Sequence, residues 1–247
     1  MKSCVGFIVL STQRTGSHLL RSVIRQHPAF VLAGEALIPG TSKPGSLDAF
    51  LAATARASAP EQLWHEYLID LCDQKPSATY AGLLVKYEHV DRVMGRDFIS
   101  DPAFQGVQII HLVRRNVLRM IASHHLAVAR GAHVRDERTK FDIDSVEIPA
   151  DNVLGLLRKK VQLIEAFRER LKGRPRSCEI GYEEIMAGEV VSESLIARLC
   201  EFFAVDDAFP RQPKTVKLGP DRLREMIRNY DAVAEVVQGS EFEDMLE

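Results

Sequence analysis

The sequence lacks a large excess of charge of either sign and a long apolar run. Its 247 residues include 32 basic and 34 acidic side chains, a formal net charge of −2. That balance gives no general attraction to nucleic acid or to an anionic membrane. No stretch reaches the ~18 consecutive apolar residues of a membrane-spanning helix. We therefore expect no nucleic-acid partner and no membrane insertion, so any anion must be bound by locally placed Arg and Lys side chains.

The sequence also lacks any close pairing of cysteines. Its four cysteines are Cys4, Cys72, Cys178 and Cys200. They form no C-x-x-C pair and no zinc-ligand spacing. Cys4 and Cys178 lie in strand-like runs, which favours buried, reduced thiols and a cytoplasmic protein. The apolar stretch after Lys2 is short and has no convincing small-residue cleavage site, so we expect no secretory signal.

Apolar runs of strand length alternate with helical patterns along the chain. The strand candidates are 5–10, 30–33, 80–87, 107–113 and 176–182. The main helical patterns cover 46–58, 61–73, 117–129 and 151–171, whereas 130–149 has no clean period. This alternation predicts an α/β fold, a single domain over 1–247 in which helices flank a mostly parallel central sheet.

The first apolar run passes directly into a polar loop and a helical pattern, in CVGFIVLSTQRTGSHLL at 4–20. At the carboxyl ends of parallel strands, helix N-termini and backbone N–H groups favour anions. Gly16 permits a tight backbone approach, and Thr15 and Ser17 supply hydroxyls. Arg14 adds a permanently charged fork. The lysine of the G-x-x-x-x-G-K-S/T loop is missing, so P-loop-like phosphate binding and an ordinary turn capped by Ser17 are both open.

A second strand–helix junction lies in HLVRRNVLRMIAS at 111–123. Ser123 follows Arg115 by eight positions, about two helical turns, and Arg119 lies four from each. The three can therefore share one helix face. Taken alone, the cluster is more simply a basic, solvated helix start. Two anion-ready junctions in one domain favour a ligand with separated phosphates.

Together these stretches resemble the sulfotransferase superfamily, whose donor is 3′-phosphoadenosine 5′-phosphosulfate (PAPS). STQRTGSHLL resembles its 5′-phosphosulfate loop, and RRNVLRMIAS resembles its 3′-phosphate motif, in which Arg and Ser stand eight apart. EIGYEEI (179–185) is similar to a late strand-plus-YEDL feature, and LREMIRNYDAV (223–233) resembles a C-terminal helix of bacterial members. GEALIPG and GLLVKYEHV resemble the bacterial carbohydrate-type branch, which includes trehalose sulfotransferase. His18 and Asn116-Val117 depart from the usual pattern.

The resemblance implies transfer of a sulfuryl group from PAPS, without a metal, to a hydroxyl of a carbohydrate or another small metabolite. Arg14 would contact the bridging and sulfuryl oxygens, and the backbone of Thr15, Gly16, Ser17 and His18 would hold the 5′-phosphate. Arg115 and Ser123 would bind the 3′-phosphate. Tyr182 would approach the adenine, and Lys214 or Thr215 would close over the nucleotide.

The catalytic base has two candidates. Glu35 follows a strand-like run and a glycine, and a partly dry strand end would suit proton abstraction; the carbohydrate-type resemblance also favours it. The rival is the cluster Lys86–His89, because the cytosolic branch of the family has a lysine two residues before its catalytic histidine. Here Glu88 occupies that offset and His89 follows. A loop carboxylate paired with arginine is the structural alternative for Glu35, and a surface role is the alternative for Glu88 and His89.

Two other functions remain open from the sequence. One is a nucleoside triphosphate–dependent kinase with an atypical loop, and the other is a non-catalytic nucleotide-binding protein. His124, His125 and His133 do not predict a metal site, because adjacent helical histidines point to different faces. The acceptor is not encoded in any motif, although 36–60 and 124–150 are expected to shape its pocket. A homodimer is possible.

Overall fold

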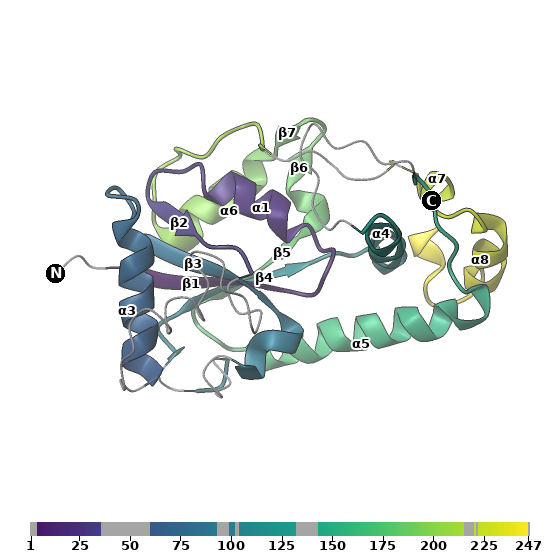
Figure 1. Cartoon of the computed structure of the whole chain (residues 1–247), viewed down its shortest axis with the longest axis horizontal. Coiled ribbons are helices and arrows are strands. Elements are labelled where there is room, and N and C mark those ends of the chain that lie inside the picture. Colours follow the sequence, from purple (N-terminus) through teal and green to yellow (C-terminus); the bar gives the residue numbers. More distant parts are fainter. Residues whose placement is uncertain are drawn as a thin grey trace.

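The computed structural model describes residues 4–35, 60–92, 99–101, 104–131, 143–214, 220 and 222–246 (Figure 1). Five strands form one parallel sheet in the order β2-β3-β1-β4-β5. They are β1 (Val5–Ser11), β2 (Phe30–Leu32), β3 (Tyr80–Lys86), β4 (Gln108–Val113) and β5 (Ser177–Gly181). The prediction of an α/β fold with a parallel central sheet is confirmed.

Helices cover both faces of this sheet and continue beyond its carboxyl edge (Figure 1). The helices are α1 (Ser17–Ile24), α3 (Pro60–Asp73), α4 (Val117–Ala129), α5 (Val153–Leu171), α6 (Glu193–Phe203), α7 (Leu223–Met226) and α8 (Tyr230–Val237). Side chains of α1 and α6 pack on one face with Phe7 and Val9, whereas α3 and α5 pack on the other with Ile8 and Leu10. Successive residues of a strand point to opposite faces, so β1 is apolar throughout because both of its faces are buried.

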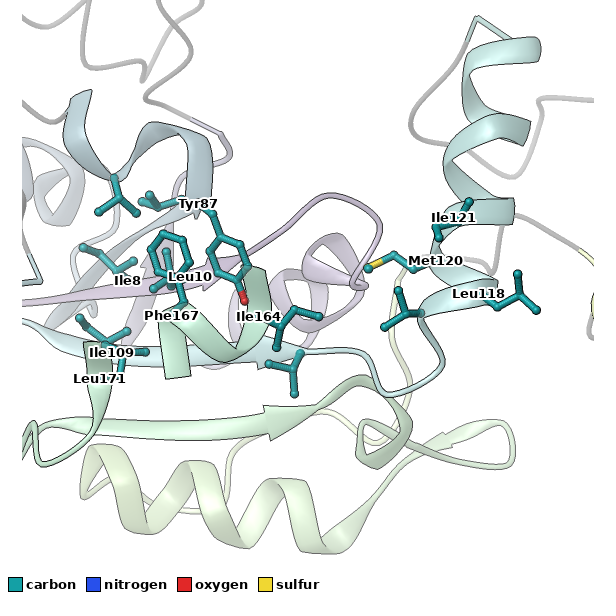
Figure 2. Packing of buried hydrophobic residues seen from close by; sticks show 14 of the residues in the cluster. Ile8, Leu10, Tyr87, Ile109, Leu118, Met120, Ile121, Ile164, Phe167 and Leu171 are labelled. Carbon is teal, nitrogen blue, oxygen red and sulfur yellow. The ribbon is translucent and has the colours of Figure 1, made fainter. Parts of the chain in front are cut away.

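The face covered by α5 is closely packed. Figure 2 shows Phe167 and Leu171 of α5 beside Ile8, Leu10 and Ile109 of the sheet. All five side chains are buried. This contact fixes α5 along the sheet, and its N-terminal half extends past the carboxyl ends of the strands, where ligands bind in such folds (Figure 1).

Short elements that the sequence did not predict connect the main ones. They are η1 (Tyr87–Arg92), η3 (Ala150–Asn152), η4 (Tyr182–Glu184), η5 (Glu243–Met245) and a two-stranded hairpin of β6 (Met186–Ala187) and β7 (Val190–Val191). The helical pattern at 46–58 and most of the 130–149 loop lie outside the described residues. Near the C-terminus, the Asn229 side chain exchanges two hydrogen bonds with the backbone of Ile148, which anchors α8 beside α5.

The expectation of reduced cysteines is wrong for one pair. Cys4 and Cys72 form a disulfide that joins the chain just before β1 to the end of α3. Their Cα atoms come within 6.7 Å because α3 packs across the start of the sheet, which no local pattern predicts. Cys178 and Cys200 are free. The disulfide removes the support that reduced thiols lent to a cytoplasmic location. None of the described helices is both long and apolar enough to span a membrane.

Candidate functional site

The loop between β1 and α1 has an unusual backbone. Arg14 and Gly16 both have positive φ angles, 64° and 85°. Thr15 is fully buried, and its hydroxyl donates to the carbonyl oxygen of Thr12 over 3.0 Å. Left-handed residues beside a helix N-terminus form the type of concave backbone that binds anions. The loop thus has the local shape expected for a phosphate site.

Gly16 is required at its position for two reasons. Its φ angle lies in the left-handed region, which side chains other than glycine rarely adopt. In addition, a Cβ atom at Gly16 would lie 2.2 Å from a ring carbon of Tyr182. Tyr182, predicted to approach an adenine, therefore packs against the loop itself.

Ser17 does not cap α1, so the alternative of an ordinary turn capped by Ser17 is wrong. Gly16 is the N-cap residue, and no side chain caps the helix. The Ser17 hydroxyl instead accepts a hydrogen bond from Lys86 Nζ over 2.9 Å. Ser17 is the first helical residue, which turns its side chain towards β3 rather than back along the helix.

Lys86 braces the loop from the neighbouring strand. It is the last residue of β3, pairs in register with Ser11 and is only 4% exposed. Its Nζ also donates to Ser11 Oγ over 3.3 Å and to the Thr12 carbonyl oxygen over 3.5 Å. Burial lowers the pKa of Lys86, and the nearby Glu35 opposes that shift. Lys86 is thus a buried cation at the centre of the site.

Glu35 lies between Lys86 and His18. Its Oε1 is 3.4 Å from Lys86 Nζ and 3.8 Å from His18 Nε2, and its side chain is 28% exposed. Burial lowers the pKa of His18, while Glu35 opposes the shift. The carboxylate predicted as the base therefore stands beside the loop, paired with a lysine rather than an arginine. His18, a departure from the family pattern, faces this carboxylate.

Arginines line the other side of the loop. Arg14 Nε donates to Ser123 Oγ of α4 over 3.1 Å. Arg114 donates to the Arg14 carbonyl oxygen over 3.3 Å and lies 4.2 Å above the centre of the Tyr182 ring. Burial lowers the pKa of Arg14, and the positive charges of Arg114 and Arg130 add to the effect. Such a concentration of positive charge favours a multiply charged anion.

The second junction differs from its prediction. α4 begins at Val117, so Arg115 precedes the helix and does not share a helix face with Arg119 and Ser123. Arg119 is buried and donates to the Pro220 carbonyl oxygen over 2.6 Å. The Arg115 side chain pairs with Glu184, whereas Ser123 meets Arg14. The described contacts thus engage Arg115 and Ser123 with different partners.

The remaining predicted residues lie at the edge of the site or outside the described residues. His89 is half-buried in η1, and Glu88 next to it accepts a hydrogen bond from Gln13 Nε2 over 3.0 Å. Lys214 is exposed, and Thr215 lies outside the described residues. Within the described part of the chain, no group of His, Cys, Asp and Glu side chains could hold a metal ion.

Sequence reasoning missed Lys160, which reaches the loop from α5. Its Nζ donates to Thr12 Oγ1 over 3.0 Å, and burial lowers its pKa. Thr12 therefore accepts a hydrogen bond from Lys160 on its side-chain oxygen and another from Lys86 on its carbonyl oxygen. Lys160 is one of several charged residues on an amphipathic helix, and nothing in the local sequence distinguishes it from its exposed neighbour Lys159.

Comparison of the chain with protein-family models and with curated proteins finds no match. The loop has two left-handed residues, Arg14 and Gly16. Arg114, Lys86 and Lys160 surround it, and Glu35 stands at its edge. This arrangement can bind an anion through fixed positive charges and can place a carboxylate next to it.

Proposed function

We propose that the protein is a phosphate-binding transferase of the α/β class. More particularly, we propose a sulfotransferase that moves a sulfuryl group from PAPS to a hydroxyl of a carbohydrate or another small metabolite. One observation carries the proposal: the hydrogen bond between Arg14 and Ser123 joins the two segments that resemble the phosphosulfate and 3′-phosphate motifs. The Cys4–Cys72 disulfide does not favour the expected cytoplasmic location, because disulfides are rare in reducing compartments.

The donor would be held mainly by the loop after β1. Backbone N–H groups from Thr15 to His18 would meet the 5′-phosphate, and Arg14 would meet the bridging and sulfuryl oxygens. Ser123 and Arg115 would bind the 3′-phosphate. Burial of Arg14 supports its role, because a charge in a partly dry site interacts more strongly with an anion than one in water.

In the proposed reaction, the acceptor hydroxyl oxygen forms a bond to sulfur as the bond from sulfur to the bridging phosphate oxygen breaks. The electron pair of the broken bond stays on that oxygen, where the Arg14 charge stabilises it. The proton of the acceptor hydroxyl moves to Glu35. The products are a sulfate ester and 3′-phosphoadenosine 5′-phosphate. Lys86 and His18 hold the Glu35 carboxylate from two sides.

A magnesium-dependent kinase is less well supported by the same contacts. In a triphosphate loop, the hydroxyl after the P-loop lysine binds the magnesium ion. Ser17 is the first residue of α1, and its hydroxyl accepts from Lys86 Nζ over 2.9 Å. An ammonium group in that position competes with a metal ion for the hydroxyl.

Binding and transfer experiments test the proposal. Titration calorimetry is expected to detect tight binding of 3′-phosphoadenosine 5′-phosphate, weak binding of ATP with magnesium, and much weaker nucleotide binding by Arg115→Ala. Labelled sulfate from PAPS is then expected to appear on hydroxyl acceptors. Preference for ATP with magnesium would favour the kinase, and nucleotide binding without transfer to any acceptor pool would favour a non-catalytic protein.

A further inference from the structure

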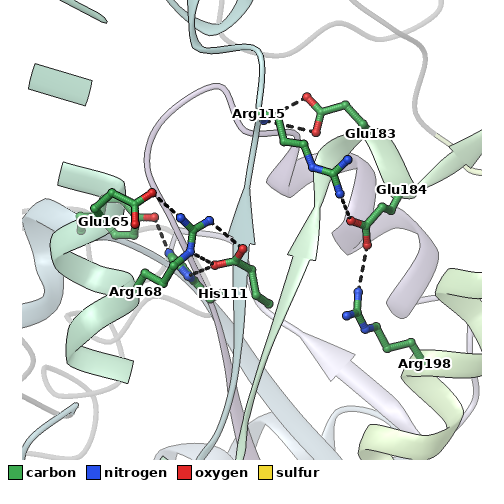
Figure 3. Close-up of polar contacts among 9 residues, drawn as sticks. His111, Arg115, Glu165, Arg168, Glu183, Glu184 and Arg198 are labelled. Atoms are coloured by element: carbon green, nitrogen blue, oxygen red, sulfur yellow. Dashed lines mark hydrogen bonds and ion pairs between the residues drawn. The ribbon is translucent and has the colours of Figure 1, made fainter. Parts of the chain in front are cut away.

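Glu184 lies between two arginines at the second junction. Its Oε1 accepts from Arg115 over 2.5 Å, and its Oε2 accepts from Arg198 of α6 over 2.9 Å (Figure 3). The Arg115 side chain is 70% exposed and that of Glu184 is 34% exposed. The Glu184 carboxylate therefore binds the Arg115 guanidinium, the group that the proposed function assigns to the 3′-phosphate.

The neighbouring Glu183 occupies the backbone donors at the same place. Its carboxylate accepts from the N–H groups of Arg115 and Asn116 over 3.1 to 3.3 Å. These are the donors that a phosphate would otherwise use just before α4. Recognition of an anion at this junction thus depends on side chains, and on the availability of Arg115 above all.

We propose that Glu184 is an internal competitor for Arg115 and weakens the binding of nucleotides that carry a 3′-phosphate. This inference rests on the proposed function. When such a nucleotide binds, its 3′-phosphate displaces the Glu184 carboxylate from Arg115, and the displaced carboxylate stays bound to Arg198. The consequence for a transferase is faster release of the bisphosphorylated product, a step that limits turnover in many enzymes.

The charge of a phosphate and the exposure of the Arg115 side chain both favour replacement of the Glu184 carboxylate by the 3′-phosphate. A phosphate group carries a charge of about −1.5 to −2 at neutral pH, against −1 for the carboxylate, so it binds Arg115 more strongly. An exposed ion pair changes an equilibrium constant by about fivefold at most, so competition from Glu184 lowers the affinity for the bisphosphate by no more than about fivefold. Glu184 can therefore tune the affinity without blocking the subsite. Arg198 opposes the competition, because it shares the carboxylate with Arg115.

The test compares two probes on four proteins by titration calorimetry. The probes are 3′-phosphoadenosine 5′-phosphate and AMP, which lacks the 3′-phosphate. The proteins are the wild type, Glu184→Gln, Arg198→Gln and the double variant. Glu184→Gln is expected to bind the bisphosphate about threefold to fivefold more tightly and AMP with unchanged affinity. Arg198→Gln is expected to bind the bisphosphate more weakly, and this loss is expected to vanish in the double variant.

Glu189→Gln is the matched control, since it removes the same charge from an exposed residue between β6 and β7; its affinities are expected to equal those of the wild type. Weaker or unchanged bisphosphate binding by Glu184→Gln would overturn the inference, because Glu184 would then position Arg115 or be irrelevant to it. An equal gain for AMP would also overturn it, by indicating a general field effect. If the wild type binds no bisphosphate, the proposed function itself fails.

Discussion

Arg14 Nε donates a hydrogen bond to Ser123 Oγ over 3.1 Å, which joins residues 109 positions apart in the chain. One residue belongs to the loop after β1 and the other to the second turn of α4. In the sequence these segments are two separate phosphate motifs. Because they are in contact, a substitution in one motif is expected to change the side-chain positions in the other.

Ser123→Ala is expected to weaken binding of 3′-phosphoadenosine 5′-phosphate by about tenfold. The change removes a proposed phosphate ligand and also the group that orients Arg14, and a hydrogen bond to a charged group contributes about 1.5–3 kcal/mol. Calorimetry measures the effect. Ser123→Thr keeps the hydroxyl and is expected to retain most of the affinity. Equal affinities for Ser123→Ala and the wild type would remove Ser123 from the site.

Glu35→Gln is expected to lower turnover by about 10²–10⁴-fold, the usual contribution of a general base. Donor affinity is expected to stay within about twofold of the wild type, because the amide keeps the shape of the carboxylate. Sulfate transfer and nucleotide titration measure the two quantities separately. Near-normal turnover would assign the base to Glu88 or His89, which Glu88→Gln and His89→Gln would then distinguish.

Gly16→Ala is expected to destabilise the fold more than Gly173→Ala does. Both glycines have positive φ, at 85° and 77°, so both substitutions carry a backbone strain of about 1–2 kcal/mol. Only at Gly16 does the new Cβ meet the Tyr182 ring; at Gly173 nothing lies within 4 Å. Chemical denaturation measures both losses of unfolding free energy. Equal losses would show that Tyr182 yields to the added methyl group.

Lys160→Met is expected to weaken nucleotide binding by about tenfold, because Thr12 loses the ammonium group that holds its hydroxyl, an interaction of about 1.5 kcal/mol. Methionine keeps the length of the side chain and its packing. Lys159→Met removes the same charge from an exposed neighbouring residue and is the control. If both variants bind equally weakly, Lys160 acts only through the general field of α5.

Reduction of the Cys4–Cys72 disulfide is expected to lower the free energy of unfolding by about 2–4 kcal/mol, since the bond closes a long loop in the unfolded chain. Denaturation with and without a reductant measures the change. In Cys72→Ser, the reductant is expected to have no further effect. A wild type insensitive to reductant would mean that the two thiols are not bonded in solution.

Most of the fold could be predicted from the sequence, because strands buried on both faces are continuous apolar runs. The α4 pattern at 117–129 matches the observed helix, and each predicted strand agrees with the observed one within about two residues, the usual uncertainty of element ends. The loop after β1 and Glu35 could be placed near one another for a similar reason. Both follow strands of a parallel sheet, whose carboxyl ends lie at one edge.

The other contacts of the site depend on packing between distant elements. Lys160 meets Thr12 only because α5 lies along the sheet at one particular angle and rotation. The partner of Arg115 depends on η4, a short turn with no periodic pattern. The pairing of Cys4 with Cys72 depends on where α3 crosses β1. Local periodicity carries none of this information.

The pairing of β1 with β3 places Ser11 directly opposite Lys86. Because side chains alternate between the two faces of a strand, a slip of one residue would turn Lys86 to the opposite face of the sheet. The ammonium group would then lose Ser17 and Glu35 together. The backbone hydrogen bonds that align the two strands therefore also set the position of a buried charge. A mutation that weakens this alignment would alter the chemistry at the loop even if it changed no residue that contacts the ligand.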